Sequence, residues 1–155
     1  MEKVNFIVSY NTDKGIRKLT NQDALLMKVN NTPNGRVGLF VVCDGMGGLE
    51  QGEIASATVI RRLDKWYEEE FEGLLKIGAE EVRKSLVEKV YELNSLLLNY
   101  SLENNIKLGT TLTAMLIIYD NVTIFQVGDS RVYKFKDNIE ILTKDQTFVA
   151  REVER

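Results

Sequence analysis

Asp44 is the residue of this sequence best placed for chemistry, because it follows an apolar run and immediately precedes glycines. The run at residues 39–42 predicts a central strand buried on both faces, and Gly45, Gly47 and Gly48 come after the aspartate. A strand end holds a carboxylate rigidly, while glycines let the backbone approach an ion closely. We therefore predict that the Asp44 carboxylate and the Gly45 carbonyl are oxygen ligands of a metal ion.

Two other interpretations compete with a metal site at this segment. An ordinary Asp-Gly turn would explain Asp44, although three glycines within four residues after a central strand exceed what a turn requires. A nucleotide phosphate loop needs GxxxxGK followed by Ser or Thr, and Leu49 and Glu50 stand after the glycines instead. Because a leading carboxylate also repels a bare phosphate, we favour a cation.

Two further aspartates lie where polar loops meet predicted strands. Asp23 ends the polar stretch 11–23, and Asp129 follows Gly128. Taken singly, each fits a capping or turn aspartate better than a metal ligand. The hypothesis of a metal site therefore depends on the combination of Asp23, Asp44 and Asp129.

The elements that must position these residues are strands and two helices. Short β-like runs are predicted at residues 4–10, 24–29, 36–43, 110–119, 122–127, 131–136 and 139–142, with turns at 30–35, 120–121 and 137–138. Apolar residues recur every three or four positions over 53–75 and 79–103, which predicts two amphipathic helices. The side chains expected to face a sheet are Trp66, Phe71, Leu86 and Leu93. No repeat or linker divides residues 1–155, so we expect one α+β domain.

Composition and charge exclude several classes of function. Twenty Lys and Arg against 23 Asp and Glu give 155 residues a net charge of -3, which offers nucleic acid no general attraction. The one cysteine, Cys43, cannot form an internal disulfide, and the charged start lacks the apolar run of a signal peptide. No apolar stretch is long enough to span a membrane. We therefore expect a cytoplasmic protein.

Several short motifs follow one another along the chain, at residues 12–15 (TDKG), 21–23 (NQD), 42–48 (VCDGMGG), 52–53 (GE), 109–111 (GTT), 127–133 (VGDSRVY) and 142–145 (LTKD). In these segments the sequence resembles the bacterial form of the metal-dependent type 2C, or PPM, serine/threonine protein phosphatases. The order and spacing of the segments agree with that family across nearly the whole chain. The resemblance implies a PPM-type β-sandwich, in which two antiparallel sheets are flanked by helices and Mg²⁺ or Mn²⁺ ions sit at the sheet edge.

The resemblance also implies roles for individual residues. Asp44 would bridge two metal ions, Gly45 would give its carbonyl to one of them, and Asp23 would hold metal-bound water. Asp129 would help to bind a third ion. Oxygen ligands suit hard Mn²⁺ or Mg²⁺, and the chain has no histidine for zinc. The implied function is hydrolysis of phosphate monoesters on serine or threonine of phosphoproteins, by a water that two metal ions activate.

A phosphorylated protein is the implied substrate, with a cognate Ser/Thr kinase as the opposing enzyme. To grip the phosphate, the family usually has an arginine five residues before the aspartate matched by Asp23. Lys18 occupies this position, with Arg17 beside it, and lysine offers a point charge where arginine offers a planar fork. An exposed surface lysine explains Lys18 equally well. Leu49 and Gln146 stand where histidines are common, so neither position offers a general acid.

The largest departure from the family lies at the C-terminal end. After the segment matched by residues 142–145, members continue into further strands with two more metal-binding aspartates, in an SDG and a DN segment, and neither segment follows Asp145 in residues 146–155. We expect the fold and the ion site to be incomplete, residues 146–155 to form a helix, and a homodimer to cover the exposed sheet edge. A second hypothesis therefore stands beside the first. It describes a weak or inactive, truncated phosphatase-like module that binds a phosphoprotein or another partner.

Overall fold

An antiparallel sheet of four strands organises the protein, in a computed structural model that describes residues 5–16, 18–46 and 51–147. The strands are β1 (Asp23–Thr32), β2 (Gly35–Asp44), β3 (Leu112–Ile118) and β4 (Asn121–Val127), and they neighbour one another in that order. A separate antiparallel hairpin joins β5 (Tyr133–Phe135) and β6 (Ile139–Ile141). The predicted α+β class with antiparallel sheets is confirmed. Among the described residues the second sheet has only these two strands.

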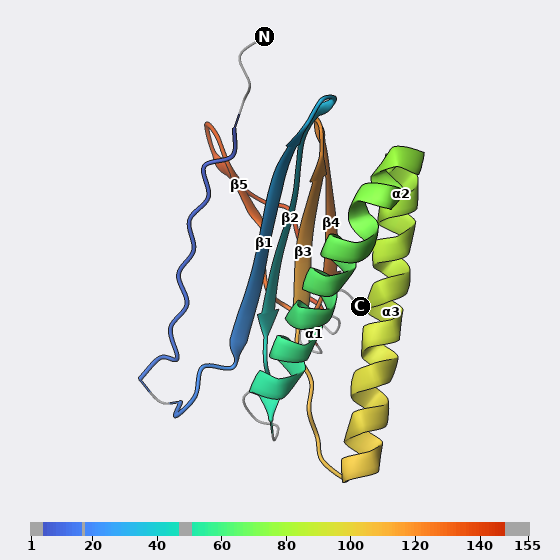
Figure 1. Ribbon diagram of the computed structural model, residues 1–155. Coiled ribbons are helices and arrows are strands. Elements are labelled where there is room, and N and C mark those ends of the chain that lie inside the picture. The colour runs from blue at the N-terminus through green and yellow to red at the C-terminus, as the bar shows by residue number, and fades with distance from the viewer. Residues whose placement is uncertain (1–4, 17, 47–50, 148–155) are drawn as a thin grey trace, which may run out of the picture.

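Helices cover one face of the four-stranded sheet (Figure 1). One continuous rod consists of α1 (Gly52–Trp66), the π-helical turn η1 (Tyr67–Phe71) and α2 (Glu72–Ile77), and α3 (Ala79–Asn104) runs back beside it. Both predicted helices are confirmed. The four side chains expected to face the sheet are at most 4% exposed: Trp66, Phe71, Leu86 and Leu93.

None of the helices in the described ranges combines the length and the apolar character that crossing a membrane would require.

The sequence does not predict the π-helical turn in the first helical rod. This turn brings three aromatic side chains into the core, with Trp66 and Phe71 edge to face at 6.1 Å and Tyr67 stacked on Phe71 at 4.3 Å between ring centroids. Trp66 also donates its Nε1–H to the Ser85 hydroxyl of α3 at 2.9 Å. Because a π turn adds one residue to the helical repeat, adjacent Trp66 and Tyr67 can both pack inward.

β2 is fully buried on one face and only partly covered on the other, so the prediction of burial on both faces is wrong at Val42. The side chains that point toward the helices are at most 1% exposed: Val37, Leu39, Val41 and Cys43. On the opposite face Val42 is 51% exposed, because every described helix lies on the other side of the sheet. The apolar run therefore carries the ordinary alternation of a strand with one covered face.

The segment at residues 5–10 forms no strand, so the prediction of a strand at 4–10 is wrong for the described part. The segment runs along the sheet face opposite to the helices (Figure 1). Phe6 packs edge to face on Phe40 at 5.7 Å between centroids, and the Arg36 guanidinium lies 5.0 Å from the Phe6 ring centre. None of the described strands pairs with this segment. Its aromatic residue Phe6 packs on the sheet, and the segment forms no hydrogen-bonded ladder with the described strands.

The turns differ slightly from those predicted. β1 continues to Thr32, so the predicted turn at 30–35 shrinks to residues 33–34, and the Thr32 hydroxyl donates to the Gly35 carbonyl at 2.7 Å. The β3–β4 turn lies one residue earlier than predicted, with Tyr119 at φ 58°. Residues 148–155 of the predicted C-terminal helix lie outside the described residues, and residues 146–147 are not helical.

Candidate metal centre

Two aspartates face each other at one end of the sheet. Asp23 is the first residue of β1 and Asp44 the last of β2, and the two are direct partners in the antiparallel register. Both remain exposed to solvent. The pKa of Asp44 is raised, first by partial loss of water around its carboxyl and then by the charge of Asp23 and a hydrogen bond between the two carboxyls. Like charges held opposite each other destabilise a strand pair, and a cation between them would remove this repulsion.

Two more charged side chains act on this pair. Lys18 lowers the pKa of Asp44 and Asp129 raises it, so both lie within electrostatic range of the Asp44 carboxyl. Both are exposed, Lys18 in the loop before β1 and Asp129 in the loop after β4. The structure therefore pairs Asp23 with Asp44 and places Asp129 and Lys18 within electrostatic range of Asp44. Arg17, the other residue predicted to bind phosphate, lies outside the described residues.

A hollow of about 330 Å³ opens beside Asp23 in the loop before β1, and Lys14 and Lys18 are part of its lining. Asn21 fixes this loop. Its Oδ1 accepts a hydrogen bond from the Asp23 backbone N–H at 3.0 Å, and its Nδ2 donates to the Thr12 hydroxyl at 2.7 Å. The loop thus places the ammonium groups of Lys14 and Lys18, together with the Asp13 carboxylate, around a hollow beside Asp23, where a phosphate group could approach.

Gly45 joins the acidic pair to the start of α1 through close backbone packing. Its N–H donates to the Gln22 carbonyl at 3.0 Å, and the Ser56 hydroxyl of α1 donates to the same oxygen at 2.6 Å. A Cβ atom on Gly45 would lie 2.4 Å from the Gly52 carbonyl oxygen and 2.6 Å from that of Gln22. Only glycine therefore fits beside Asp44. The sequence indicates that Gly45 allows the backbone to approach an ion closely, and the structure adds a steric reason for glycine at this position.

Thr111, which directly precedes β3, holds the end of β2. The Asp44 backbone N–H donates to the Thr111 hydroxyl at 2.9 Å, and the Thr111 N–H donates to the Asp44 carbonyl at 2.9 Å. The same hydroxyl lies 3.0 Å from that of Ser130. One buried threonine thus links Asp44 to the loop that carries Asp129. Thr111 belongs to one of the matching segments, but the sequence does not predict its contact with Asp44. That contact depends on strand pairing between residues 67 positions apart.

Replacing Thr111 by valine should destabilise the protein by about 1 to 3 kcal/mol, because the partly buried Asp44 N–H loses its acceptor while the side-chain shape is kept. Urea denaturation measures this change. Thr111→Ser retains the hydroxyl and serves as the matched variant, in which hydrogen bonding should persist. A larger loss of stability in Thr111→Ser than in Thr111→Val would show that the methyl group matters and the hydroxyl does not.

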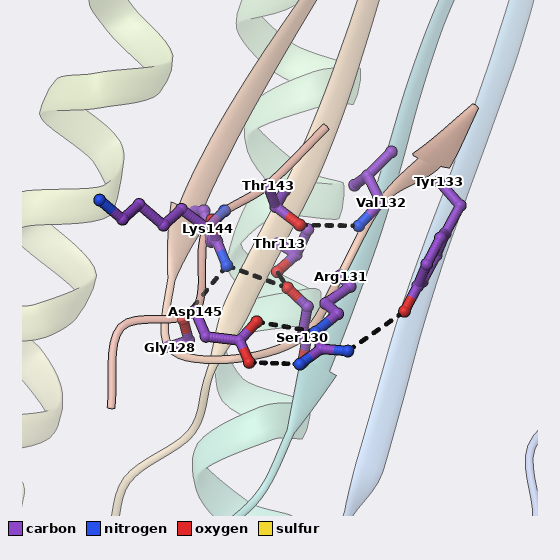
Figure 2. A network of polar contacts seen from close by, with 10 residues as sticks. Thr113, Gly128, Ser130, Arg131, Val132, Tyr133, Thr143, Lys144 and Asp145 are labelled. Atoms are coloured by element: carbon purple, nitrogen blue, oxygen red, sulfur yellow. Dashed lines mark hydrogen bonds and ion pairs between the residues drawn. The ribbon is translucent and has the colours of Figure 1, made fainter. Parts of the chain in front are cut away.

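An ion pair closes the loop that carries Asp129 (Figure 2). Arg131 Nε lies 2.8 Å from Asp145 Oδ1 and its Nη2 lies 2.5 Å from Oδ2, which is bidentate geometry. Pairing lowers the pKa of Asp145 and raises that of Arg131. Gln126 of β4 donates to the Ser130 carbonyl at 3.1 Å. No partner for Asp145 is predicted from the sequence. The opposite charges of Arg131 and Asp145, which lie in two of the matching segments, could have suggested this pair.

The described residues provide some, but not all, of the ligands that a hard divalent cation requires. The carboxylates of Asp23 and Asp44, beside the backbone carbonyl of Gly45, are the oxygen donors that Mg²⁺ and Mn²⁺ prefer. Within residues 5–16, 18–46 and 51–147, no group of three or more His, Cys, Asp and Glu side chains is close enough to hold a metal ion. In this geometry Asp129 adds charge to the carboxylate pair without completing a cluster of three.

Comparison with known proteins shows which family the chain resembles. The family model described as protein phosphatase 2C matches residues 13–153. The serine/threonine phosphatase stp of Listeria welshimeri is 34% identical over 147 residues, covering 90% of this chain and 54% of the relative. The crystal structure of serine/threonine phosphatase Stp1 from Staphylococcus aureus has a TM-score of 0.79 at 33% identity, covering 93% of this chain and 55% of that one. The catalytic domain of PstP, solved in complex with two manganese ions, has a TM-score of 0.66 at 32% identity, covering 93% and 57%.

The chain spans about half the length of the curated relatives it matches. The matched range nevertheless includes Asp23, Asp44, Gly45 and Asp129, and it also holds the Arg131–Asp145 ion pair. The resemblance stated from the sequence is therefore confirmed, and the chain belongs to the protein phosphatase 2C family.

Proposed function

We propose that this chain provides the Asp23–Asp44 side of a metal-dependent active site that hydrolyses phosphate monoesters on serine or threonine of phosphoproteins. The observation that carries the proposal is the direct pairing of these two carboxylates at the open end of the sheet. The relatives in Listeria and Staphylococcus are serine/threonine phosphatases by name, which supports the same reaction class. A serine/threonine kinase would be the opposing enzyme.

Asp44, Asp23 and the Gly45 carbonyl would hold Mn²⁺ or Mg²⁺, with two or three ions in a complete site and Asp129 nearest the loosest of them. When bound, such ions acidify water and neutralise charge on the phosphoryl oxygens. The protein's own contribution is positioning. The β1–β2 ladder fixes the distance between the two carboxylates, and the Thr111 hydroxyl holds the backbone of Asp44 in place.

Lys18 would orient the substrate phosphate, with Arg17 as a second cation beside it. Lys18 lines the hollow next to Asp23 and acts electrostatically on Asp44. An ammonium group attracts phosphate as a point charge and does not form the planar, bidentate contact of a guanidinium. We therefore infer that binding of the phosphate depends more on charge than on geometry at this position.

Lys18→Ala should change two affinities in opposite directions. Removing a positive charge near the carboxylates should tighten Mn²⁺ binding roughly two- to fivefold and weaken binding of a phosphothreonine peptide by a similar factor. Calorimetric titration of each ligand measures both. Lys136→Ala removes the same charge in the β5–β6 turn and should change neither affinity. If Lys18→Ala binds the peptide as tightly as the unaltered protein, Lys18 is an ordinary surface lysine with no role in phosphate binding.

The proposed reaction is tested by turnover of p-nitrophenyl phosphate and a phosphothreonine peptide with Mn²⁺ and with EDTA. We expect slow, Mn²⁺-dependent turnover by this 155-residue polypeptide, because a single carboxylate pair holds two mutually repelling cations weakly. Asp44→Asn should abolish the turnover, and Asp137→Asn, which removes the same charge in the β5–β6 turn, should not. Turnover that persists in EDTA or in Asp44→Asn would contradict the proposal.

The same experiment addresses a second function. Because the described residues contain no group of three potential metal-binding side chains, a module that binds a phosphoprotein without hydrolysing it is the alternative. That function would appear as Lys18-dependent binding of the phosphothreonine peptide with no turnover at any Mn²⁺ concentration.

A further inference from the structure

α3 carries an exposed apolar stripe on a side that does not face the core. Val87, Tyr91, Leu98 and Leu102 are 40%, 72%, 56% and 71% exposed, whereas Leu93 on the core-facing side is 4% exposed. Val87 and Leu98 are eleven residues apart, as are Tyr91 and Leu102, and eleven residues make about three helical turns. The stripe therefore runs almost straight along the helix. Exposed apolar side chains gathered in this way mark an interaction surface.

The stripe is symmetric about the midpoint between Asn94 and Ser95. Each of its apolar residues on one side of that point has an apolar counterpart at the same distance on the other side. A two-fold axis requires such a self-complementary surface, because the same patch is used by both subunits. In two antiparallel copies of α3 related through this midpoint, the facing residues would be Val87 with Leu102, Tyr91 with Leu98, and Asn94 with Ser95.

The charges on α3 select the antiparallel orientation. Residues 93–102 include no charged side chain, and the charges of the helix before its final turn lie between Glu80 and Glu92. In an antiparallel pair Glu88 faces Ser101 of the second copy. In a parallel pair Glu88 would face Glu88 of the second copy, and like charges across an interface are unfavourable. The charged segment 88–92 of one helix is thus matched to the neutral segment 97–101 of the other.

There is also space beside the stripe. A hollow of about 340 Å³ lies between α3 and β4, and its lining includes Val87 and Tyr91 together with Phe125 and Val127 of β4. Large side chains from a second helix can therefore pack next to Tyr91 without displacing the core.

We propose that this chain forms a homodimer in which the stripes of two α3 helices pack antiparallel about a two-fold axis at residues 94–95. This surface is separate from the exposed sheet edge through which the sequence predicts a homodimer, and from the Asp23–Asp44 site. Four to five turns of helix bury less than a standard protein interface, so we expect a dissociation constant on the order of 10 µM.

Sedimentation equilibrium from about 1 to 500 µM, a range that brackets this constant, tests the proposal. A monomer–dimer equilibrium is expected, and Leu98→Glu should weaken it at least tenfold because each dimer would bury two carboxylates. Ile77→Glu on α2, where Ile77 is 75% exposed, makes the same change away from the stripe and should have no effect. Val122→Glu, on the exposed strand β4, should also have no effect. A monomer throughout the range overturns the proposal, and so does a dimer that only Val122→Glu dissociates.

Oxidative cross-linking tests the orientation. Asn94→Cys places a thiol beside the two-fold axis and should form a disulfide-linked dimer, while the native Cys43 is fully buried and should stay silent. Leu102→Cys lies on the stripe and should not cross-link, because the antiparallel arrangement places it opposite Val87 of the second copy, whereas a parallel pair would place it opposite itself. Circular dichroism of each variant verifies that α3 is intact. Equal cross-linking of Leu102→Cys and Asn94→Cys would overturn the antiparallel arrangement.

Discussion

Replacing Gly45 by alanine should destabilise the protein by about 3 kcal/mol or more and remove its affinity for Mn²⁺. The added Cβ would lie 2.4 Å from the Gly52 carbonyl oxygen and 2.6 Å from the Gln22 carbonyl oxygen. Both are backbone atoms, so no side-chain rotation relieves the contact, and β1, β2 or α1 must move. Because Gly45 directly follows Asp44, such a movement also changes the separation of the two aspartates. Urea denaturation and calorimetric titration with Mn²⁺ measure the two effects.

Gly73→Ala provides the matched control for the methyl group itself. Gly73 lies inside α2, and a Cβ at this position would meet nothing within 4 Å. Alanine should therefore stabilise the helix by about 0.5 to 1 kcal/mol and leave Mn²⁺ binding unchanged. If Gly45→Ala unfolded at the same urea concentration as the unaltered protein, the close approach of Gly45 to Gly52 would be wrong.

Asp44→Asn should have opposite effects on stability without and with metal. Without Mn²⁺ the substitution removes the repulsion between Asp44 and Asp23, which as a like-charged cross-strand pair costs roughly 0.2 to 1 kcal/mol. With Mn²⁺ the variant should lose at least about tenfold in affinity, because carboxylates are the charged ligands in this pair. Thermal denaturation at several Mn²⁺ concentrations measures both, since a ligand stabilises the folded state in proportion to its binding.

Asp137→Asn controls for the change in net charge, and we expect it to retain the Mn²⁺-dependent increase in melting temperature. Asp23→Asn should behave like Asp44→Asn, since either substitution leaves one carboxylate. An increase with Mn²⁺ in Asp44→Asn as large as in the unaltered protein would place the ions elsewhere.

The elements that could be predicted from the sequence are those with a regular local pattern. The 3.6-residue repeat predicts both helices, and alternation predicts the strands of the main sheet to within a few residues. The failures come from information that is not local. Residues 5–10 have the composition of a strand but no described partner strand, and the run at 39–42 does not reveal that one face of β2 is only partly covered.

The residues of the candidate site also divide into those that a local sequence pattern predicts and those that depend on contacts between distant segments. Asp44 and Gly45 could be predicted because a strand end and a glycine run are adjacent in the sequence. Asp23 could be placed beside Asp44 only through the resemblance to a family, since its neighbour is set by register across the β1–β2 hairpin. The contacts of Thr111 with Asp44, and of Arg131 with Asp145, join segments far apart in the chain. Composition and spacing alone do not predict such pairs.

The register of β1 and β2 limits where this sequence can gain or lose residues. An unbroken ladder of paired residues leads from the turn at 33–34 to the Asp23–Asp44 pair, about 30 Å away. One residue inserted within β2 would rotate every later side chain to the other face and turn the carboxylate toward the core, where Cys43 is buried. An insertion in the turn leaves both strands paired as before. Length variation among related sequences is therefore expected at residues 33–34, and the spacing from the turn to each aspartate should be constant.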